Sequence, residues 1–522
     1  MLSRSGAIRS WCTVSRGLVK IVAAMAGATE GNTTTPASDG SNGGSRTPTR
    51  VTRREPSLSP LKTLSKDVVA HLRDGKDTLN QKQNVVYRAV PSTRAGRAAG
   101  FASLFVQLGW DHIVGFNDGG MLARHSHQRI VETLCRMRGA VLKLGQMLSI
   151  QDAATVSPHV VQIFEKVRDS AYAMPQAQLN RTLTKEYGNA NWRKDCFVEF
   201  DDDPIAAASI GQVHRATVKG DGDVTTEPVA VKVQYPGVAA SIDSDIANLK
   251  TLIALKLLPP GMFVDNILQE LRQELALECR YTIEASKQTR YAVLIQQVPE
   301  LREVFVVPKV YESLSTDKVL VSQLVSGVPI DRLATITGNQ DLKNYVAQRI
   351  FFLTLSELFC WRFMQTDPNY SNFLFDAETN RINLLDFGAA REYSAEFVRD
   401  YLDVVAAAAQ QDRDTIIAKS IKLGFLTGNE MKLMLDAHVS SVMLLGKPFR
   451  HRDRPFDFAA ENLPSLIQEH VPTMIKLRLR PPPTPVYSLH RRLSGTILLA
   501  TKLKATVNTG ELFWNICDSY RT

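Results

Sequence analysis

The chain has 522 residues, of which 44% are apolar and 22% are charged. This ordinary globular composition excludes a mostly disordered, collagen-like or coiled-coil protein. No run of about 18 uninterrupted apolar residues occurs, so the sequence holds no unambiguous membrane-spanning helix. The six cysteines form no Cys-x-x-Cys pair, which excludes a disulfide scaffold or a zinc ribbon and favours a reducing compartment.

The net charge of +9 is concentrated at the two ends of the chain. Residues 1–60 hold eight Lys/Arg against three Asp/Glu, and residues 471–522 hold eight against two. A nucleic-acid binder usually spreads basic residues over its folded domain, so no nucleic-acid partner is expected. The C-terminal excess suits an anionic lipid surface, although ordinary solvated charge explains it equally well.

The N-terminal third predicts three segments in succession. Residues 1–30 carry four basic residues and no acid before Glu30, which is typical of a mitochondrial transit peptide. Residues 31–75 begin with a Thr/Ser/Gly/Pro-rich stretch that predicts a disordered linker. Residues 76–194 are expected to form a helical extension, because apolar residues from Ile130 to Leu148 recur at helical spacing.

The remainder predicts a small β-rich unit over residues 195–330 and a large α-rich unit over 331–522. Short β-type runs lie between residues 196 and 235. Helical patterns follow at 241–257, 264–291, 341–364 and 395–445. This order indicates an α+β architecture with two lobes.

Two acidic motifs near the middle of the second unit predict phosphate chemistry. Asp367 and Asn372 are five residues apart, and the triplet Asp386-Phe387-Gly388 follows fourteen residues later. This is the spacing of the catalytic and metal-binding loops of protein kinases. Asn372 and Asp386 offer the hard oxygen ligands that Mg²⁺ prefers, and Asp367 is placed to accept or orient a proton.

The β-rich unit carries a matching lysine and loop. Lys232 ends the stretch Val-Ala-Val-Lys, as in the third strand of a kinase small lobe, and is expected to contact nucleotide phosphates. The nucleotide loop is expected at Ala206, Ala207, Ala208, Ser209, Gly211 and Val213, which keep the kinase spacing but have alanine in place of the first two glycines. An Ala-rich helix start is the alternative explanation of this run.

Two glutamates are candidates for ion pairs with lysines. Glu278 and Glu284 are six residues apart, so on one helix they would point about 120° apart and reach different partners. We assign Glu284 to Lys232 and Glu278 to Lys143. Solvated helix-surface glutamates are the alternative for either one.

The ordered motifs together resemble the UbiB family of atypical kinases, in particular its mitochondrial coenzyme-Q-biosynthesis branch, over about residues 80–510. The resemblance rests on KLGQ, AAASIGQVH, VAVK, the ECRYTIEA run, MQTDPNYSNF, LLDFGAAREY and YSLHRRLSG. It implies a bilobal protein-kinase-like fold with a helical extension in which Lys143, Gly145 and Gln146, with Glu278, are regulatory. Ser322, Gln323, Leu324 and Val325 would form the hinge that holds adenine.

The resemblance also implies a function. The protein would be an atypical kinase or ATPase that binds ATP and Mg²⁺ and supports ubiquinone biosynthesis at the matrix face of the inner membrane, with peripheral attachment. Its partners would be biosynthetic proteins and anionic inner-membrane lipid, and a homodimer is one arrangement the sequence allows. Three other readings are a nucleotide-switched scaffold, a conventional protein kinase and, least favoured, a metal hydrolase.

Two positions depart from the family pattern. Arg280 stands where the family usually has an acid that helps to hold Lys143. It lies four residues before Glu284, a spacing that allows it to pair with Glu284 and compete with Lys232. Tyr370 replaces the usual tryptophan and keeps an aromatic ring.

Overall fold

The computed structural model describes residues 172–220, 226–254 and 264–521. It also describes seven isolated earlier positions, Leu58, Val69, Leu72, Val86, Tyr87, Gly96 and Lys143. All of them belong to the unit that spans residues 52–522. The predicted transit peptide, nearly all of the linker, and Gly145, Gln146 and the helix expected around them lie outside the described residues.

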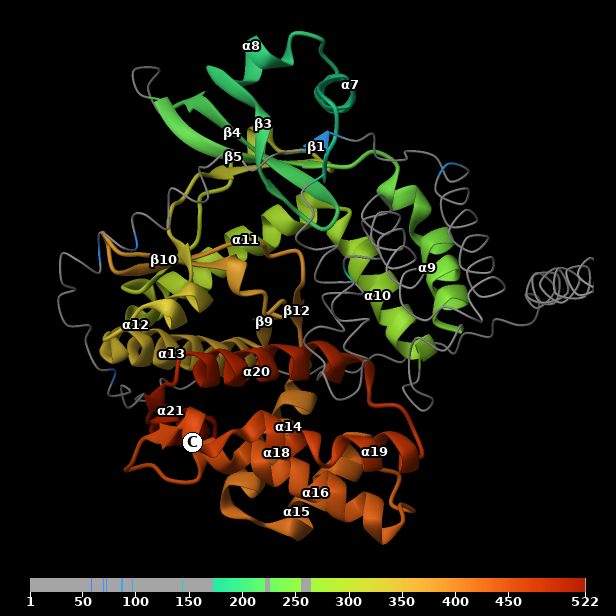
Figure 1. Ribbon diagram of the computed structural model, residues 1–522, viewed down its shortest axis with the longest axis vertical. Coiled ribbons are helices and arrows are strands. Elements are labelled where there is room, and N and C mark those ends of the chain that lie inside the picture. The colour runs from blue at the N-terminus through green and yellow to red at the C-terminus, as the bar shows by residue number, and fades with distance from the viewer. Residues whose placement is uncertain are drawn as a thin grey trace, which may run out of the picture. The chain divides into compact units, whose positions relative to one another are not determined.

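The small lobe is built on an antiparallel four-stranded sheet in the order β3-β4-β5-β7 (Figure 1). Its strands are β3 (Glu199–Ala207), β4 (Gly211–Lys219), β5 (Thr226–Gln234) and β7 (Val319–Gln323). Helices α7 (Gln176–Tyr187) and α8 (Trp192–Cys196) precede the sheet, and β1 (Val86–Tyr87) pairs in parallel with β2 (Tyr172–Ala173).

The alternation of side chains along β5 orients its lysine. Val229, Val231 and Val233 are fully buried in the small-lobe core, where Leu179, Leu183 and Trp192 also lie. Because successive residues of a strand point to opposite faces, Lys232 points away from those valines. The alternating pattern of β5 therefore explains both the buried face of the strand and the direction in which Lys232 points.

The helical pattern over residues 264–291 is divided between two helices, a break that the sequence analysis did not predict. Helix α10 ends at Glu278 and α11 begins at Tyr281 (α10, Val264–Glu278; α11, Tyr281–Gln296). Arg280 between them has an extended backbone, with φ −120° and ψ 91°. The N–H of Tyr281 donates to Asp317 O at 2.9 Å, a bond that takes the place of an intrahelical one.

The large lobe begins with α13 (Gln340–Leu355), which continues as a π-helical segment (η3, Ser356–Trp361). The helix predicted up to residue 364 stops here, because Arg362 has a left-handed backbone (φ 55°) and β9 (Phe363–Gln365) follows. Strand β12 (Ala390–Glu392) pairs antiparallel with β9. A second sheet has the order β6-β11-β10-β8 (β6, Phe305–Val306; β11, Arg381–Leu384; β10, Phe373–Asp376; β8, Val328–Pro329).

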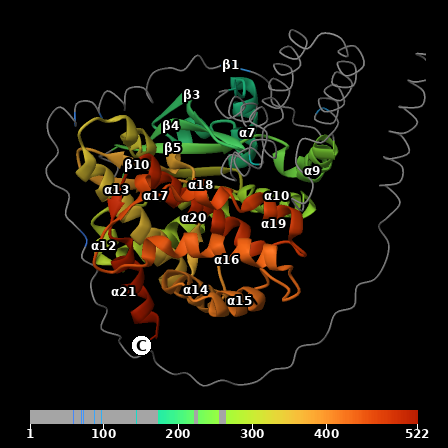
Figure 2. The ribbon, with the colours of Figure 1, turned by 60° about the horizontal axis from the view of Figure 1, so that its bottom comes forward.

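The predicted helical stretch over residues 395–445 is three helices that pack on one another (Figure 2). They are α14 (Ala395–Gln410), α15 (Arg413–Lys422) and α16 (Lys432–Gly446). The first break falls at Gln411, whose backbone is left-handed (φ 63°), and at Asp412, whose carboxylate caps α15 through Thr415 N.

The remaining elements lie between and after these. They are α9 (Val238–Ala254), α12 (Pro299–Arg302), η1 (Glu312–Leu314), η2 (Ile330–Thr335), η4 (Tyr370–Asn372), η5 (Lys447–Phe449), β13 (Phe456–Asp457), α17 (Phe458–Glu461), α18 (Leu463–Gln468), α19 (Val471–Leu477), α20 (Thr484–Lys502), β14 (Thr506–Val507) and α21 (Thr509–Arg521). Within the described part of the chain, none of the helices combines the length and the hydropathy needed to span a bilayer.

Candidate active site

Lys232 lies among acidic side chains from both lobes. Its Nζ donates to both carboxylate oxygens of Glu284, at 2.7 and 3.0 Å, and lies 3.5 Å from Asp386 Oδ2. The ring of Tyr281 faces the same ammonium, with its centroid 5.0 Å away. The predicted pairing of Lys232 with Glu284 is confirmed, and the pair joins β5 to the first turn of α11.

The backbone around Asp386 is held from both sides. Asp386 has a left-handed backbone (φ 55°), which costs a non-glycine residue of the order of 1–3 kcal/mol unless its surroundings enforce it. Gln365 Nε2 donates to Asp386 O at 3.1 Å, and Lys287 Nζ donates to Gly388 O at 2.8 Å. Asp386 Oδ1 accepts from Gly388 N at 3.1 Å, so one carboxylate oxygen serves the turn.

Asp367 and Asn372 lie beside the segment that carries Asp386. Asn372 Nδ2 donates to Asp367 Oδ2 at 3.2 Å, and the N–H of Asn369 donates to Asp367 Oδ1 at 3.2 Å. Leu385 N donates to Asn372 O at 2.8 Å, which brings Asn372 next to the residue that precedes Asp386. The structure thus assembles Lys232, Glu284, Asp367, Asn372 and Asp386 into one site.

Lys143 is buried in a second ion-pair cluster that adjoins the first. It donates to Glu278, and its Nζ lies 3.7 Å from Glu274 Oε2. Ser209, in the turn between β3 and β4, donates to the other oxygen of Glu278 at 3.3 Å. The predicted pairing of Lys143 with Glu278 is confirmed. Through Ser209, the cluster also contacts the loop expected to cover the phosphates.

Carboxylates outnumber the cations in the two clusters. Glu274 and Glu278 face Lys143, Glu284 and Asp386 face Lys232, and Arg491 pairs with Glu274. Although burial works against charge, Asp386 and Glu284 raise the pKa of Lys232, so the lysine stays protonated. Burial, together with Asp386 and Glu278, outweighs Lys232 and raises the pKa of Glu284 to about 7. The lysines Lys232 and Lys143 outweigh burial at Asp386 and lower its pKa. Glu284, rather than Asp386, is therefore the carboxyl that takes up a proton and relieves the surplus negative charge.

Arg280 does not compete for Glu284, so that expectation is wrong. Arg280 is exposed at the start of α11, and its carbonyl, not its side chain, meets Glu284, through Glu284 N. Both Glu284 oxygens go to Lys232. The break between α10 and α11 turns the Arg280 side chain outward, while Glu274, one turn before Glu278, supplies the second carboxylate to Lys143.

The residues expected to form the nucleotide loop lie at the β3–β4 hairpin, and the alternative of an Ala-rich helix start is wrong. Ala206 pairs with Val213, and Ala208 N donates to Gly211 O at 2.9 Å. A Cβ built on Gly211 would lie 2.5 Å from Val233 O, so only glycine allows β4 to approach β5 here. The kinase spacing of the sequence therefore located this turn correctly.

The four residues expected to form the hinge lie at the end of β7. Ser322 and Gln323 are the last two residues of the strand, and Leu324 and Val325 follow it. Ser322 pairs with Ala230 within the sheet. The N–H groups of Gln323 and Leu324 donate to Lys309 O at 2.8 Å and Pro228 O at 3.0 Å. Backbone recognition of a ligand at this place is left to the remaining peptide groups, among them those of Val325.

Comparison with known proteins agrees with this arrangement. Residues 166–420 match the family model of the ABC1 atypical kinase-like domain. The chain is 42% identical over 480 residues to the mitochondrial atypical kinase COQ8B of Danio rerio, covering 88% of this chain and 75% of the relative. It is 38% identical over 459 residues to the mitochondrial atypical kinase COQ8 of Saccharomyces cerevisiae, covering 85% of this chain and 88% of the relative. The chain belongs to the ABC1 family of atypical kinases.

A solved structure shares the fold of this family member. The complex of Rv3197 with erythromycin from Mycobacterium tuberculosis aligns with a TM-score of 0.51 over 72% of this chain and 91% of the solved chain. The sequence identity is 24%, so the likeness concerns the kinase-like fold alone. The predicted bilobal α+β fold is confirmed.

The sequence analysis did not identify several residues of the site. Glu274 was missed although Glu270, Glu274 and Glu278 recur every four residues, a spacing that places them on one face of α10. Gln365 and Lys287 were given no role in the sequence analysis. Tyr281, three residues before Glu284, could have been found from helical spacing once the start of α11 was known.

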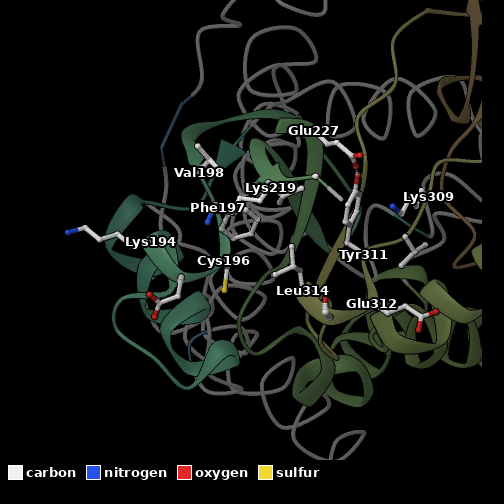
Figure 3. A pocket seen from close by; sticks show the side chains of 15 residues that line it. Lys194, Cys196, Phe197, Val198, Lys219, Glu227, Lys309, Tyr311, Glu312 and Leu314 are labelled. Carbon is white, nitrogen blue, oxygen red and sulfur yellow. Dashed lines mark hydrogen bonds between the residues drawn. The ribbon is translucent and has the colours of Figure 1, made fainter. Parts of the chain in front are cut away.

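A pocket of about 700 Å³ in the small lobe lies away from these clusters (Figure 3). Its lining comes from α8 and the two residues that follow it, the end of β4, the start of β5 and residues 309–314, and includes none of the site residues. Tyr311 donates to Glu227 beside the pocket, and Lys219, Lys309 and Glu312 also line it. Because these charges are of both signs, the pocket selects no class of ligand.

Proposed function

We propose that the chain binds Mg-ATP at the site of Lys232, Asp367, Asn372 and Asp386 and catalyses phosphoryl transfer or ATP hydrolysis. The observation that carries this proposal is the position of Lys232, which is held by Glu284 and reaches Asp386 of the opposite lobe. An ammonium held in this position is suited to bind phosphate, because the lysine side chain is already oriented before a nucleotide binds.

The donor set fits magnesium. Asn372 donates to Asp367 through its side-chain Nδ2, so the side-chain oxygen Oδ1 can act as a ligand. Asp386 has a second carboxylate oxygen, Oδ2, besides the one that bonds to Gly388 N. The described residues contain no group of three or more His, Cys, Asp or Glu side chains suited to a metal. A coordination shell of two protein oxygens, with phosphate oxygens and water as the other ligands, suits Mg²⁺. The ion would neutralise charge on the phosphates.

The hairpin and the hinge would bind the rest of the nucleotide. The β3–β4 turn, residues 206–211, would cover the phosphates, and the peptide groups around Val325 would hold the base. Asp367 would accept or orient the proton of an attacking hydroxyl. Asn372 and Asn369 N hold both of its oxygens, so its carboxylate is oriented beforehand.

The cellular role we propose is support of ubiquinone biosynthesis in mitochondria, at the matrix face of the inner membrane. The relatives bear the names of mitochondrial atypical kinases COQ8, and residues 1–30 have the composition of a transit peptide. The basic C-terminal segment suits anionic lipid, and other biosynthetic proteins would be its partners.

A nucleotide-switched scaffold is the second candidate. The bond between Ser209 and Glu278 ties the phosphate loop to buried Lys143. A nucleotide that moved this loop would move the segment that carries Lys143, with or without turnover.

Phosphate release from ATP by the full chain, with and without Mg²⁺ and anionic vesicles, tests the enzymatic proposal. We expect Mg²⁺-dependent release that is lost in Asp386→Asn and kept in Asp453→Asn, a matched change at an exposed loop position. Equal release by Asp386→Asn and the wild type would refute the assignment of the site. Nucleotide binding without any release would favour the scaffold.

A further inference from the structure

The motif YSLHRRLSG, residues 487–495, has no role in the site as described so far. It lies in α20, which contacts α13 and runs beside β9 and β12 (Figure 1). Arg491 and Arg492 each lie three or four residues from both Ser488 and Gly495, so the four residues share one helix face. Ser488, Arg491 and Arg492 are 0%, 7% and 2% exposed.

This face meets the residues around Asp367. Arg491 donates to Glu274 Oε1 at 2.6 Å, and its Nε lies 3.4 Å from Thr366 O, the carbonyl that precedes Asp367. The other oxygen of Glu274 faces Lys143 at 3.7 Å. Arg491 therefore connects the peptide group before Asp367 with the buried cluster of Lys143.

Arg492 reaches the same strand from its other side. Its guanidinium donates to Glu357 Oε2 at 3.1 Å, and Glu357 Oε1 accepts from Gln365 N at 2.9 Å and from Tyr291 Oη at 2.6 Å. The Gln365 side chain in turn donates to Asp386 O. Both arginines are buried, and each is oriented by a buried carboxylate.

The end of this helix face touches the residues after Asp367. A Cβ built on Gly495 would lie 2.3 Å from Pro368 Cβ, so the helix and the loop are in direct contact. Tyr370 Oη donates to Gly495 O at 3.2 Å. Ser488 at the other end receives a bond from Arg391 of β12 at 2.8 Å.

We propose that α20 positions the catalytic segment, Gln365–Tyr370, and that Arg491 is its principal positioning residue, acting through Thr366 O on Asp367. The proposal rests on the proposed function. It gives a role in catalysis to α20, a helix that supplies no ligand to ATP or metal. Arg491 bonds to a carboxylate and lies against a carbonyl at once, a geometry that the planar guanidinium supports and an ammonium does not. Its contact with Glu274 would also couple the placement of Asp367 to the state of Lys143.

Steady-state phosphate release by the full chain, combined with hydrogen exchange of residues 363–372, tests this proposal. We expect Arg491→Gln to lower kcat about tenfold or more, while the KM for ATP changes less than about threefold, because misplacement of Asp367 affects the transition state and not binding. Exchange of residues 363–372 should become faster. Arg491→Lys should recover part of kcat, since it can keep Glu274.

Two further variants complete the test. Arg480→Gln, at an exposed position before α20, is the matched control and should leave kcat and exchange unchanged. Gly495→Ala should lower kcat by displacing Pro368, with Arg491 intact. A normal kcat and normal exchange in Arg491→Gln would overturn the proposal. If the wild type releases no phosphate, the proposed function fails, and the exchange of residues 363–372 alone decides whether α20 positions the segment.

Discussion

Glu284 is the carboxyl that takes up a proton to relieve the excess negative charge of the site, and its pKa connects this proton to stability. Its folded pKa of about 7 lies above the ordinary value of 4.5, so the folded protein binds this proton more tightly than the unfolded chain does. The contribution of Glu284 to stability is therefore largest below pH about 4.5 and declines as the pH rises through about 7. The full shift corresponds to about 3 kcal/mol.

Urea unfolding at a series of pH values measures this effect. In the absence of Mg-nucleotide, we expect Glu284→Gln to remove the decline in the free energy of unfolding that Glu284 causes between pH 5 and 8. A cation bound at Asp386 should weaken the decline in the wild type, because it screens the charge that raises the pKa of Glu284. The same pH slope in the variant and the wild type would show that another group takes up the proton.

Lys143 offers a second test at the scale of single residues. Lys143→Met should lower the free energy of unfolding by about 3 kcal/mol, because Glu278 is left buried without its cation. Adding Glu278→Gln should return part of the loss, since the neutral side chain needs no counterion. Strictly additive losses in chemical denaturation would mean that the two side chains do not interact in solution.

At the scale of elements, β4 depends on a close approach to β5 at Gly211. A Cβ there would meet Val233 O at 2.5 Å and Tyr281 Oη at 2.7 Å. We expect Gly211→Ala to destabilise the protein by about 1–3 kcal/mol and to weaken ATP binding, because it separates the hairpin from β5 and Lys232. Thermal unfolding and equilibrium binding measure the two effects, and an unchanged melting temperature would contradict the packing seen here.

The boundaries of elements show where sequence patterns suffice. The alternation of valines with Lys232 correctly predicted β5 and the direction of its lysine. Periodicity did not reveal the break between Glu278 and Tyr281, because the interaction that ends the helix is a hydrogen bond to Asp317, 36 positions away from Tyr281 in the sequence. Arg280 was misjudged for the same reason, since four-residue spacing brings side chains together only within one continuous helix.

At the scale of the whole chain, the two lobes meet through charged side chains contributed by distant segments. Motif spacing identified Lys232 and Glu284 as partners and Asp386 as a metal ligand, since each belongs to a local pattern. Glu274 and Arg491 lie 217 positions apart, and neither belongs to a pattern that names the other. Such contacts follow from the path of α20 through the large lobe, which a single sequence does not determine.

Binding of ATP to the full chain, measured at equilibrium with and without Mg²⁺, tests the central claim most directly. The wild type should bind ATP more tightly with Mg²⁺, and Lys232→Met should weaken binding about tenfold or more, because it removes a charge-assisted contact to phosphate. Lys476→Met, an exposed lysine of α19, should bind as the wild type does. Affinity that is independent of Mg²⁺ and unchanged in Lys232→Met would contradict the account.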